Sequence, residues 1–344
     1  MKKISGHKKM SISEWFSVLA QYSEENNIDR DVYGNGKFLN EFESEMAKKF
    51  GMDKALFMPS GVMAQLMAIR IWSERKKNNR FSCHSTCHLT RHENNAYQEL
   101  HGLSAVIYGK EHKVVSLSDI QTIGESISSV VIELPMRHLG GDLPEFEELR
   151  AISDYCRSKG IALHLDGARI FECIPFYQRP LSEIVALFDS AFLSFYKGIG
   201  STSGSMLFGD TDFIDNAKIW LRRHGGNLFE LFPLAVSAKY FFQKNECYFH
   251  EYFEKTKEFA EVISEFKSIH MIPSSPKTNM MHLLIPLSAA ELAKKWDESP
   301  FGDLRMGNWG EVAPSVCRLE FVIGRASLEW SPQEFKEALN YLLK

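Results

Sequence analysis

Two stretches of the sequence decide the fold, and both have the same design. The first reads Ile-Ala-Leu-His-Leu-Asp-Gly-Ala-Arg at 161–169, and the second reads Ser-Phe-Tyr-Lys-Gly-Ile-Gly-Ser-Thr-Ser-Gly at 194–204. In each, an apolar run of strand length leads into small and polar residues. The first delivers the carboxylate of Asp166 and the guanidinium of Arg169, and the second delivers the amine of Lys197. Ligands of open α/β sheets bind beyond the carboxyl ends of the strands, so these side chains mark a candidate site.

A lysine and an aspartate at the ends of two strands are the pair that pyridoxal 5'-phosphate (PLP) requires. The lysine amine bonds to the cofactor, and the carboxylate keeps the pyridine nitrogen protonated, so that the ring can accept electrons from the substrate. A desolvated lysine close to other cations is nucleophilic near neutral pH. We therefore expect Lys197 and Asp166 to be catalytic. The alternatives are an ordinary surface lysine and a turn or helix-cap aspartate.

Length and composition indicate a globular protein with two domains. The 344 residues are too many for one simple core, and 44% apolar and 24% charged residues are ordinary values. A formal net charge of −4 argues against nucleic acid or an anionic membrane surface as a partner. No run approaches the roughly eighteen apolar residues of a membrane span, and the basic start lacks the apolar core of a secretory signal. Six scattered cysteines fit reduced thiols, so we expect a cytoplasmic protein.

Strand-like and helical patterns alternate, which predicts an α/β fold with a mostly parallel sheet and helices on both faces. Strand-like runs fall at 55–58, 105–108, 129–134, 161–165, 191–195 and 205–208. Helical patterns fall at 11–26, 38–50, 63–72, 144–158, 180–188 and most of 212–245. Beyond these, helices at 251–266 and 332–343 and strands at 280–285 and 317–323 predict a smaller α+β domain. The predicted parts are an N-terminal arm and helix at 1–30, a large cofactor-binding domain at 31–247 and a small domain at 248–344.

The turn after the strand at 55–58 is a candidate phosphate loop. A strand, a small polar turn and a helix start together present free backbone N–H groups to a phosphate. The residues of this loop are Ser60, Gly61 and Val62. A Ser-Gly pair alone is also common in plain turns. Ser194 and Arg222 are further candidates for the phosphate or for a subunit interface, and a solvated helix face is the alternative for the arginine.

Taken in order, these motifs resemble the threonine aldolase branch of the PLP enzymes with the aspartate aminotransferase fold (fold type I). The resemblance is carried by Asp31-Val-Tyr-Gly34, Pro59-Ser-Gly61, His88, His164-Leu-Asp-Gly-Ala-Arg169, Ser194-Phe-Tyr-Lys197-Gly198 and Arg318-Leu319. The specific part is His-x-Asp-Gly-Ala-Arg with a lysine 31 residues after the aspartate. It implies a PLP-dependent carbon–carbon lyase that cleaves β-hydroxy-α-amino acids, such as threonine and allo-threonine, to glycine and an aldehyde.

The resemblance also implies roles around the cofactor ring. His88 would stack on the ring and help to move a proton, and Glu93 belongs to the same pattern. Ala168 would be small because the ring lies against it. His88 stands among ten residues that are rich in histidine and cysteine. Zinc binding is the alternative for this segment if His84, His88 and His92 share a helical face, although the paired spacing of a structural zinc site is missing.

For the substrate, the resemblance implies that Arg169 and Arg318 bind the carboxylate, with Ser5 as a further contact. A guanidinium suits this task because it binds a carboxylate with two hydrogen bonds. The alternative for Arg169 is a structural ion pair. Tyr33 would reach the active site of a neighbouring subunit. We therefore expect a homodimer or homotetramer whose active sites lie at the subunit interface.

Two departures from the family pattern affect the substrate and the reaction. After Glu133, threonine aldolases typically carry Asn-Thr-His-Asn before Ala-Gly-Gly, whereas this chain has Leu-Pro-Met-Arg-His-Leu-Gly-Gly. Met136 thus replaces a histidine thought to act on the substrate hydroxyl, and His138 lies two residues away. Of the N-terminal signature Ser-Asp-Thr-Val-Thr, only Ser5 matches. One alternative is a PLP enzyme acting at Cα–H, namely a β-eliminating lyase, racemase or aminotransferase. A non-enzymatic binder is the other, and the intact lysine–aspartate pair argues against it.

Overall fold

A computed structural model describes residues 2–8 and 10–344 of the chain. The chain forms two compact units. Unit 1 contains the N-terminal segment up to Met10, Pro135–Leu143 and Cys247–Lys344, and unit 2 contains Ser11–Leu134 and Pro144–Glu246. Unit 1 therefore gathers two short segments from the first half of the sequence around the C-terminal part. The domain boundaries expected from the sequence stay a prediction.

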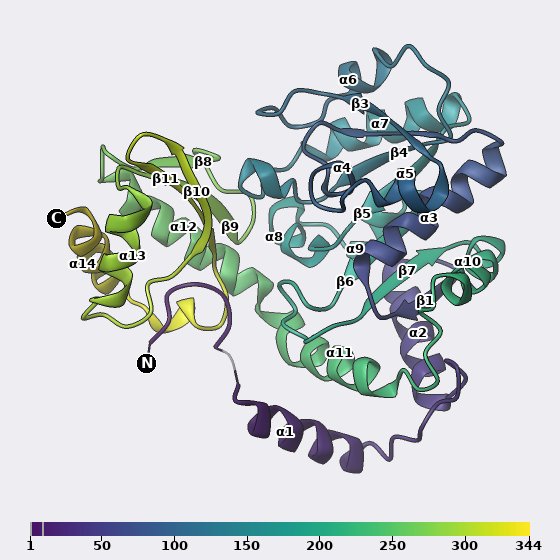
Figure 1. Cartoon of the computed structure of the whole chain (residues 1–344), viewed down its shortest axis with the longest axis horizontal. Helices are drawn as coiled ribbons and strands as arrows, with labels where there is room; N and C mark the ends of the chain where they lie inside the picture. The colour runs from purple at the N-terminus through teal and green to yellow at the C-terminus, as the bar shows by residue number, and fades with distance from the viewer. Residues whose placement is uncertain (1, 9) are drawn as a thin grey trace. The chain divides into compact units, whose positions relative to one another are not determined.

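Unit 2 is an α/β domain built on a seven-stranded sheet with the order β1-β7-β6-β5-β4-β2-β3 (Figure 1). The strands are β1 (Lys54–Met58), β2 (Arg80–His84), β3 (Ser104–Tyr108), β4 (Ser129–Glu133), β5 (Ala162–Asp166), β6 (Ser190–Ser194) and β7 (Ser205–Gly209). Five neighbouring strands pair in parallel, namely β3, β2, β4, β5 and β6 in sheet order. β7 is antiparallel to β6 and to β1. The predicted mostly parallel sheet is confirmed. The strand β2 escaped prediction because Arg-Phe-Ser-Cys-His has too few apolar residues for a buried strand.

Local signals explain where the helices of unit 2 begin and end. Ser11 and Glu14 form a reciprocal capping box at the start of α1. Gly51, in the left-handed conformation with a φ of 67°, ends α2. The helices are α1 (Ile12–Glu25), α2 (Lys37–Phe50), α3 (Gly61–Lys76), α4 (His88–Arg91), α5 (Ala96–His101), α6 (Leu117–Gln121), α7 (Phe146–Ser158), η2 (Ile170–Glu172), α8 (Ile174–Tyr177), α9 (Leu181–Val185), α10 (Thr211–Arg223) and α11 (Phe232–Asn245). Among the helices of the described ranges, none is long and apolar enough to cross a membrane.

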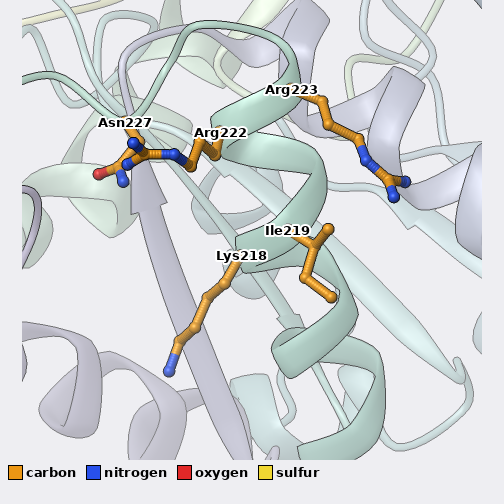
Figure 2. Close-up of a pocket in the computed structure, with 5 residues that line it drawn as sticks. All are labelled: Lys218, Ile219, Arg222, Arg223 and Asn227. Atoms are coloured by element: carbon orange, nitrogen blue, oxygen red, sulfur yellow. The ribbon is translucent and has the colours of Figure 1, made fainter.

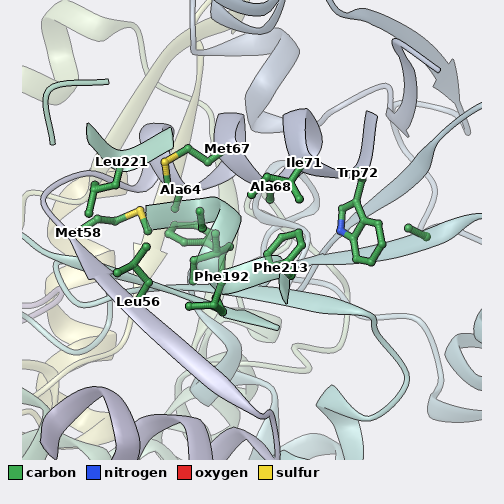
Figure 3. Close-up of a cluster of buried hydrophobic side chains, with 14 residues drawn as sticks. Leu56, Met58, Ala64, Met67, Ala68, Ile71, Trp72, Phe192, Phe213 and Leu221 are labelled. Atoms are coloured by element: carbon green, nitrogen blue, oxygen red, sulfur yellow. The ribbon is translucent and has the colours of Figure 1, made fainter. Parts of the chain in front are cut away.

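Helices cover both faces of this sheet, as the alternation along β1 illustrates. Leu56 and Met58 point into a buried cluster with α3 and α10, whereas Phe57 points the other way and meets Phe42 of α2 at 6.1 Å between ring centroids. Figure 3 shows the first cluster. Its members are Leu56, Met58, Ala64, Met67, Ala68, Ile71, Trp72, Ala162, Phe192, Leu207, Phe213, Ile214, Ala217 and Leu221. Burial on both faces explains why most strands read as continuous apolar runs.

Unit 1 is an α+β domain, as predicted, with an antiparallel sheet in the order β10-β11-β9-β8. Its elements are η1 (Arg137–Leu139), α12 (Phe249–Ser264), β8 (His270–Ile272), β9 (Met280–Ile285), α13 (Ala289–Asp297), β10 (Gly307–Ala313), β11 (Val316–Val322), η4 (Ser327–Glu329) and α14 (Pro332–Leu343). Stacked rings of Phe259, Phe321 and Phe335 join the sheet to α12 and α14. The N-terminal segment runs beside these elements, where the Ile4 N–H donates to the Asp303 carbonyl at 3.0 Å (Figure 1).

Truncating a side chain in the α3-side cluster tests this packing. We expect Phe213→Ala to lower the free energy of unfolding by about 3–5 kcal/mol, because the ring is fully buried and its removal leaves a cavity. Phe16→Ala on α1, where the ring is 62% exposed, should change it by less than about 0.5 kcal/mol. Urea unfolding followed by circular dichroism measures both. Similar losses for the two variants would contradict the described core.

Candidate active site

Most predicted site residues of unit 2 lie at or after the carboxyl ends of strands, and these ends share one edge of the sheet. β2, β4, β5 and β6 are parallel, and β1 has the same direction because β7 is antiparallel to both of its neighbours. Asp166 is the last residue of β5, and Lys197 follows the end of β6. His88 begins the short helix after β2, and Ser60 lies between β1 and α3. The fold thus brings together residues from distant parts of the sequence.

Asp166 is a buried carboxylate whose ionisation is influenced by three basic side chains. Its Oδ1 accepts a hydrogen bond from the Ala168 N–H at 3.2 Å. Burial raises the pKa of Asp166 above its ordinary value, whereas the charges of His88, Lys197 and Arg169 act to lower it. These opposing influences place the side chains of Lys197, Arg169 and His88 within electrostatic reach of the carboxylate. A further cation, such as a protonated ring nitrogen, would stabilise the ionised form.

The turn that carries Lys197 is fixed by backbone hydrogen bonds. The Gly200 N–H donates to the Lys197 carbonyl at 2.9 Å, and the Ser201 N–H donates to the Phe195 carbonyl at 2.8 Å. The Lys197 Nζ lies 5.3 Å from the centroid of the neighbouring Tyr196 ring. The lysine is therefore presented by an ordered turn that follows β6, the strand next to β5.

The predicted phosphate loop begins α3 and packs closely against β6 and its turn. Ser60 is the N-cap residue, in an extended conformation, and its hydroxyl makes no capping hydrogen bond. A Cβ added to Gly61 would lie 2.7 Å from the Phe192 ring and 2.7 Å from the Tyr196 hydroxyl. The half-buried Val62 packs against a neighbouring apolar cluster. Glycine is thus required at the position where the chain enters the helix, and the first N–H groups of α3 follow it.

Ser194 offers a second polar group for an anion. Its hydroxyl is buried at the end of β6 and has no hydrogen-bond partner among the described residues. Buried hydroxyls are normally satisfied, so this one calls for a ligand. On the other side of the loop, the Pro59 carbonyl accepts from the Ser203 hydroxyl at 2.8 Å. Across the sheet Ser194 pairs with Ser205, which pairs with Met58, two residues before the uncapped Ser60. An unsatisfied hydroxyl and a helix start with free N–H groups are both suited to an anion such as phosphate.

His88 is oriented by Glu93, which the sequence pattern paired with it. Its Nδ1 lies 2.8 Å from Oε1 of Glu93, whose side chain is only 2% exposed. Burial raises the pKa of Glu93, and the hydrogen bond to His88 opposes this shift. The carboxylate oxygen accepts the Nδ1–H, which fixes the ring orientation and leaves Nε2 as the basic nitrogen.

The histidine-rich segment does not form the helical face that zinc binding requires. His84 is the last residue of β2, and its Nδ1 lies 2.8 Å from the Thr86 hydroxyl. α4 spans only His88–Arg91. Within residues 2–8 and 10–344, no group of three or more His, Cys, Asp or Glu side chains is placed to hold a metal ion.

Arg169 lies beside Glu172, an acidic residue that was not predicted from the sequence to belong to the site. The Arg169 Nε lies 3.8 Å from Oε1 of Glu172, and the two side chains are 13% and 1% exposed. Residues three apart on a helical turn are neighbours, so the spacing of Arg169 and Glu172 in the sequence could have predicted this contact. Glu172 restricts the positions open to the guanidinium.

His164, which belongs to the Asp166 motif, has a structural role behind the site. Its Nε2 lies 2.8 Å from Oε1 of Gln65, and its Nδ1 lies 2.8 Å from the Ser190 hydroxyl. Burial lowers the pKa of His164 to about 3, so the ring is neutral. This network ties α3 to β5 and β6, two residues before Asp166. Gln65 could not be found from the sequence because its neighbours on α3 are apolar.

Arg222 and Tyr33 lie together on the surface of unit 2. Figure 2 shows a surface pocket lined by Lys218, Ile219, Arg222, Arg223 and Asn227. The Arg222 Cζ lies 5.6 Å from the centroid of the Tyr33 ring, which also meets the Phe229 ring edge-on at 5.4 Å. The residues that line this pocket do not include Lys197, Asp166 or His88. Arg222 is therefore part of a cationic surface beside exposed aromatic rings.

The remaining predicted residues lie in unit 1. Arg318 is in β11 and donates hydrogen bonds to His282 and to the carbonyl of His138. The Ser5 hydroxyl is engaged with the β11 backbone, because it donates to the Val322 carbonyl at 3.0 Å. Met136 is buried, and its backbone pairs with Asp142.

Comparison with known proteins identifies the family. The model of the beta-eliminating lyase family matches residues 18–285. A crystal structure of a candidate L-allo-threonine aldolase from Listeria monocytogenes is 40% identical, covers 99% of this chain and 95% of its own, and has a TM-score of 0.92. Low-specificity L-threonine aldolase 1 of Arabidopsis thaliana is 26% identical over 79% of this chain and 80% of its own length. A structure of SPT with PLP, at 14% identity, has a TM-score of 0.73 over 99% of this chain and 86% of its own.

The chain belongs to the beta-eliminating lyase family, which includes threonine aldolases, and has the fold of the fold type I PLP enzymes. These findings confirm the family resemblance and the fold class predicted from the sequence.

The close contact at Gly61 gives a test of the loop geometry. We expect Gly61→Ala to lower the free energy of unfolding by about 1–3 kcal/mol, because the new methyl group would overlap the Phe192 ring and the Tyr196 hydroxyl. Gly124→Ala is the matched control, since no atom lies within 4 Å of its added Cβ. Chemical unfolding of both variants measures the difference. A Gly61→Ala protein as stable as the control would show that the loop and the turn are further apart than described.

Proposed function

We propose that the strand-end site of unit 2 binds PLP. Lys197 would bond to the cofactor, and Asp166 would contact the pyridine nitrogen. The single observation that carries this proposal is the buried Asp166 carboxylate within electrostatic reach of Lys197 and His88. When bound, PLP supplies an electron-withdrawing ring that stabilises negative charge at the substrate Cα. His88 would stack on the ring, and Ala168 would leave room for it.

The phosphate of PLP would be bound at the start of α3. The support is the uncapped Ser60, the close-packed Gly61 followed by Val62, and the unsatisfied hydroxyl of Ser194. Arg222 is proposed as a further phosphate contact on sequence resemblance. Its place among cationic surface residues suits an anion, whether that anion belongs to its own subunit or to a neighbouring one.

We propose that the reaction is the cleavage of β-hydroxy-α-amino acids, with threonine and allo-threonine as substrates and glycine and an aldehyde as products. The support is the family together with the names of the Listeria monocytogenes and Arabidopsis thaliana proteins. Arg169, and Arg318 of unit 1, would bind the substrate carboxylate and so orient the Cα–Cβ bond, with Ser5 as an additional contact. His88, held by Glu93, would accept the proton of the β-hydroxyl group, directly or through water.

A second candidate function is chemistry at Cα–H, that is, β-elimination, racemisation or transamination. The observation that favours it is Met136, a buried thioether in place of the family histidine, which cannot take a proton from the substrate hydroxyl. Serine and cysteine would then yield pyruvate and ammonia, whereas threonine would yield little glycine.

We further propose that the protein is a homodimer or homotetramer in which Tyr33 completes the site of a neighbouring subunit. Several large apolar side chains of unit 2 are exposed and support a protein interface there. They include Val32, Tyr33, Ile219, Leu228 and Phe229. A cytoplasmic location is proposed as well, and the six free cysteines support it.

Product analysis of the PLP-loaded protein tests the proposed reaction. We expect threonine and allo-threonine to give glycine and acetaldehyde, and Lys197→Ala to lower kcat/KM at least about a hundredfold, because the amine takes part in the chemistry. Lys113→Ala, which changes an exposed lysine of the same unit, should retain activity. Pyruvate from serine without glycine from threonine would instead establish the second candidate. Equal activity of the two lysine variants would refute the assignment of Lys197.

A further inference from the structure

Arg318 is held by a group of side chains in unit 1 that the proposed reaction does not itself use. His282 projects from β9, which pairs with β11, and its side chain is fully buried. Trp309 is in β10, on the other side of β11. Arg137 and Glu320 form an ion pair beside them, with 2.6 Å between Nε and Oε2. Polar groups are costly to bury, so this arrangement calls for a function.

The hydrogen bonds of Arg318 define the protonation of His282. The Arg318 Nε lies 2.9 Å from Nδ1 of His282, and Nη2 lies 2.6 Å from the same atom. A guanidinium can only donate, so Nδ1 must be the acceptor and cannot carry a proton. His282 is therefore neutral, with its proton on Nε2. That nitrogen lies 3.7 Å from Oε2 of Glu320.

Trp309 restricts the guanidinium from a second direction. The pairing of β10 with β11 shifts register between Asn308 and Glu311, and Trp309 lies within this irregularity. Such bulges re-aim side chains and are common beside functional sites. The ring centroid of Trp309 lies 4.8 Å from the Arg318 Cζ and 5.1 Å from the Arg137 Cζ. The centroids of the Trp309 and His282 rings are 4.8 Å apart.

We propose that His282 is a positioning residue that holds the Arg318 guanidinium, through hydrogen bonds accepted at Nδ1, in the orientation that binds a substrate carboxylate. The inference rests on the proposed function, in which Arg318 contacts the amino acid. Two hydrogen bonds to one imidazole nitrogen, reinforced by the His138 carbonyl and the Trp309 ring, fix the plane of the guanidinium. A pre-oriented guanidinium loses less entropy on binding a carboxylate.

The charges around His282 agree with a neutral acceptor. Burial lowers the pKa of His282, Arg318 and Arg137 lower it further, and Glu320 opposes them. The ring is therefore neutral at neutral pH and gains a proton only as the pH falls below the ordinary histidine range. Protonation would remove the acceptor and place a cation against Arg318. Amino-acid binding should accordingly weaken on the acid side.

Equilibrium binding of glycine to the PLP-loaded protein, measured by calorimetry, tests the proposal. We expect His282→Phe, which keeps a ring but removes the acceptor, to weaken glycine binding about tenfold or more, with PLP affinity unchanged. His282→Asn retains an acceptor near the Nδ1 position and should restore most of the affinity. His270→Phe is the matched control, since His270 is an exposed histidine of β8 in the same sheet. Unchanged glycine binding in His282→Phe, or equal losses of glycine and PLP, would overturn the proposal.

A double-mutant cycle separates positioning from a general loss of structure. In an Arg318→Ala background, His282→Phe should have no further effect on glycine binding, because His282 acts only through the arginine. A further loss of similar size would overturn the proposal. Nitrogen NMR of the wild-type protein, with His282→Asn used for assignment, should show Nδ1 unprotonated and Nε2 protonated. A protonated Nδ1 in the wild-type protein would also overturn the proposal, and this test does not require that His282→Phe folds.

The test of His282 and the test of the proposed reaction can fail independently, and their failures can be told apart. If threonine is not cleaved but glycine binds, His282→Phe still decides the inference. If the PLP-loaded protein does not bind glycine at all, there is no carboxylate site to position, and both proposals fail. If threonine is cleaved and glycine binding is unaffected by His282→Phe, only the inference about His282 fails.

Discussion

The structure of unit 2 depends on one constraint, the burial of a carboxylate at the end of a central strand. A buried charge is costly unless other charges or hydrogen bonds compensate it. Asp166 receives a hydrogen bond from Ala168 and lies within electrostatic reach of the side chains of Lys197 and His88. The neighbouring parallel strand β6 delivers Lys197, and β2, two strands away on the other side, delivers His88 to the same edge of the sheet. The position of the site is therefore a consequence of how the strands of the sheet are connected. The carboxylate can also contact a protonated ring nitrogen, and the cofactor proposal follows from this.

Several of the side chains that we propose to contact the substrate or cofactor lie beside a buried polar side chain. Glu93 orients His88, and Glu172 lies beside Arg169. In unit 1, His282 stands in the same relation to Arg318. These neighbours have no bonds to make with a substrate in our proposals. Their effect is to reduce the rotational freedom of the groups that do, which is how a site is prepared before its ligand arrives.

The sequence predicted most of the central sheet, most helices and the placement of Asp166 and Lys197 at strand ends, because long apolar runs and small polar turns carry a strong local signal. It missed β2 and β10, which contain few apolar residues, and β8, which is only three residues long; each is paired with a neighbouring strand. For the same reason, the spacing of the histidines suggests a helical face through His84, although that residue lies in β2. Trp309 and Gln65 could not be assigned either, since their partners come from distant parts of the chain and spacing alone does not reveal them.

The central claim is that Lys197 and Asp166 face one PLP ring, and the most direct measurement is covalent. The PLP-loaded protein is reduced with borohydride, which makes the bond between cofactor and lysine permanent, and the peptides are then mapped by mass spectrometry. We expect the label on Lys197, in the peptide that follows β6. A label on another lysine, or no label despite bound cofactor, would contradict it.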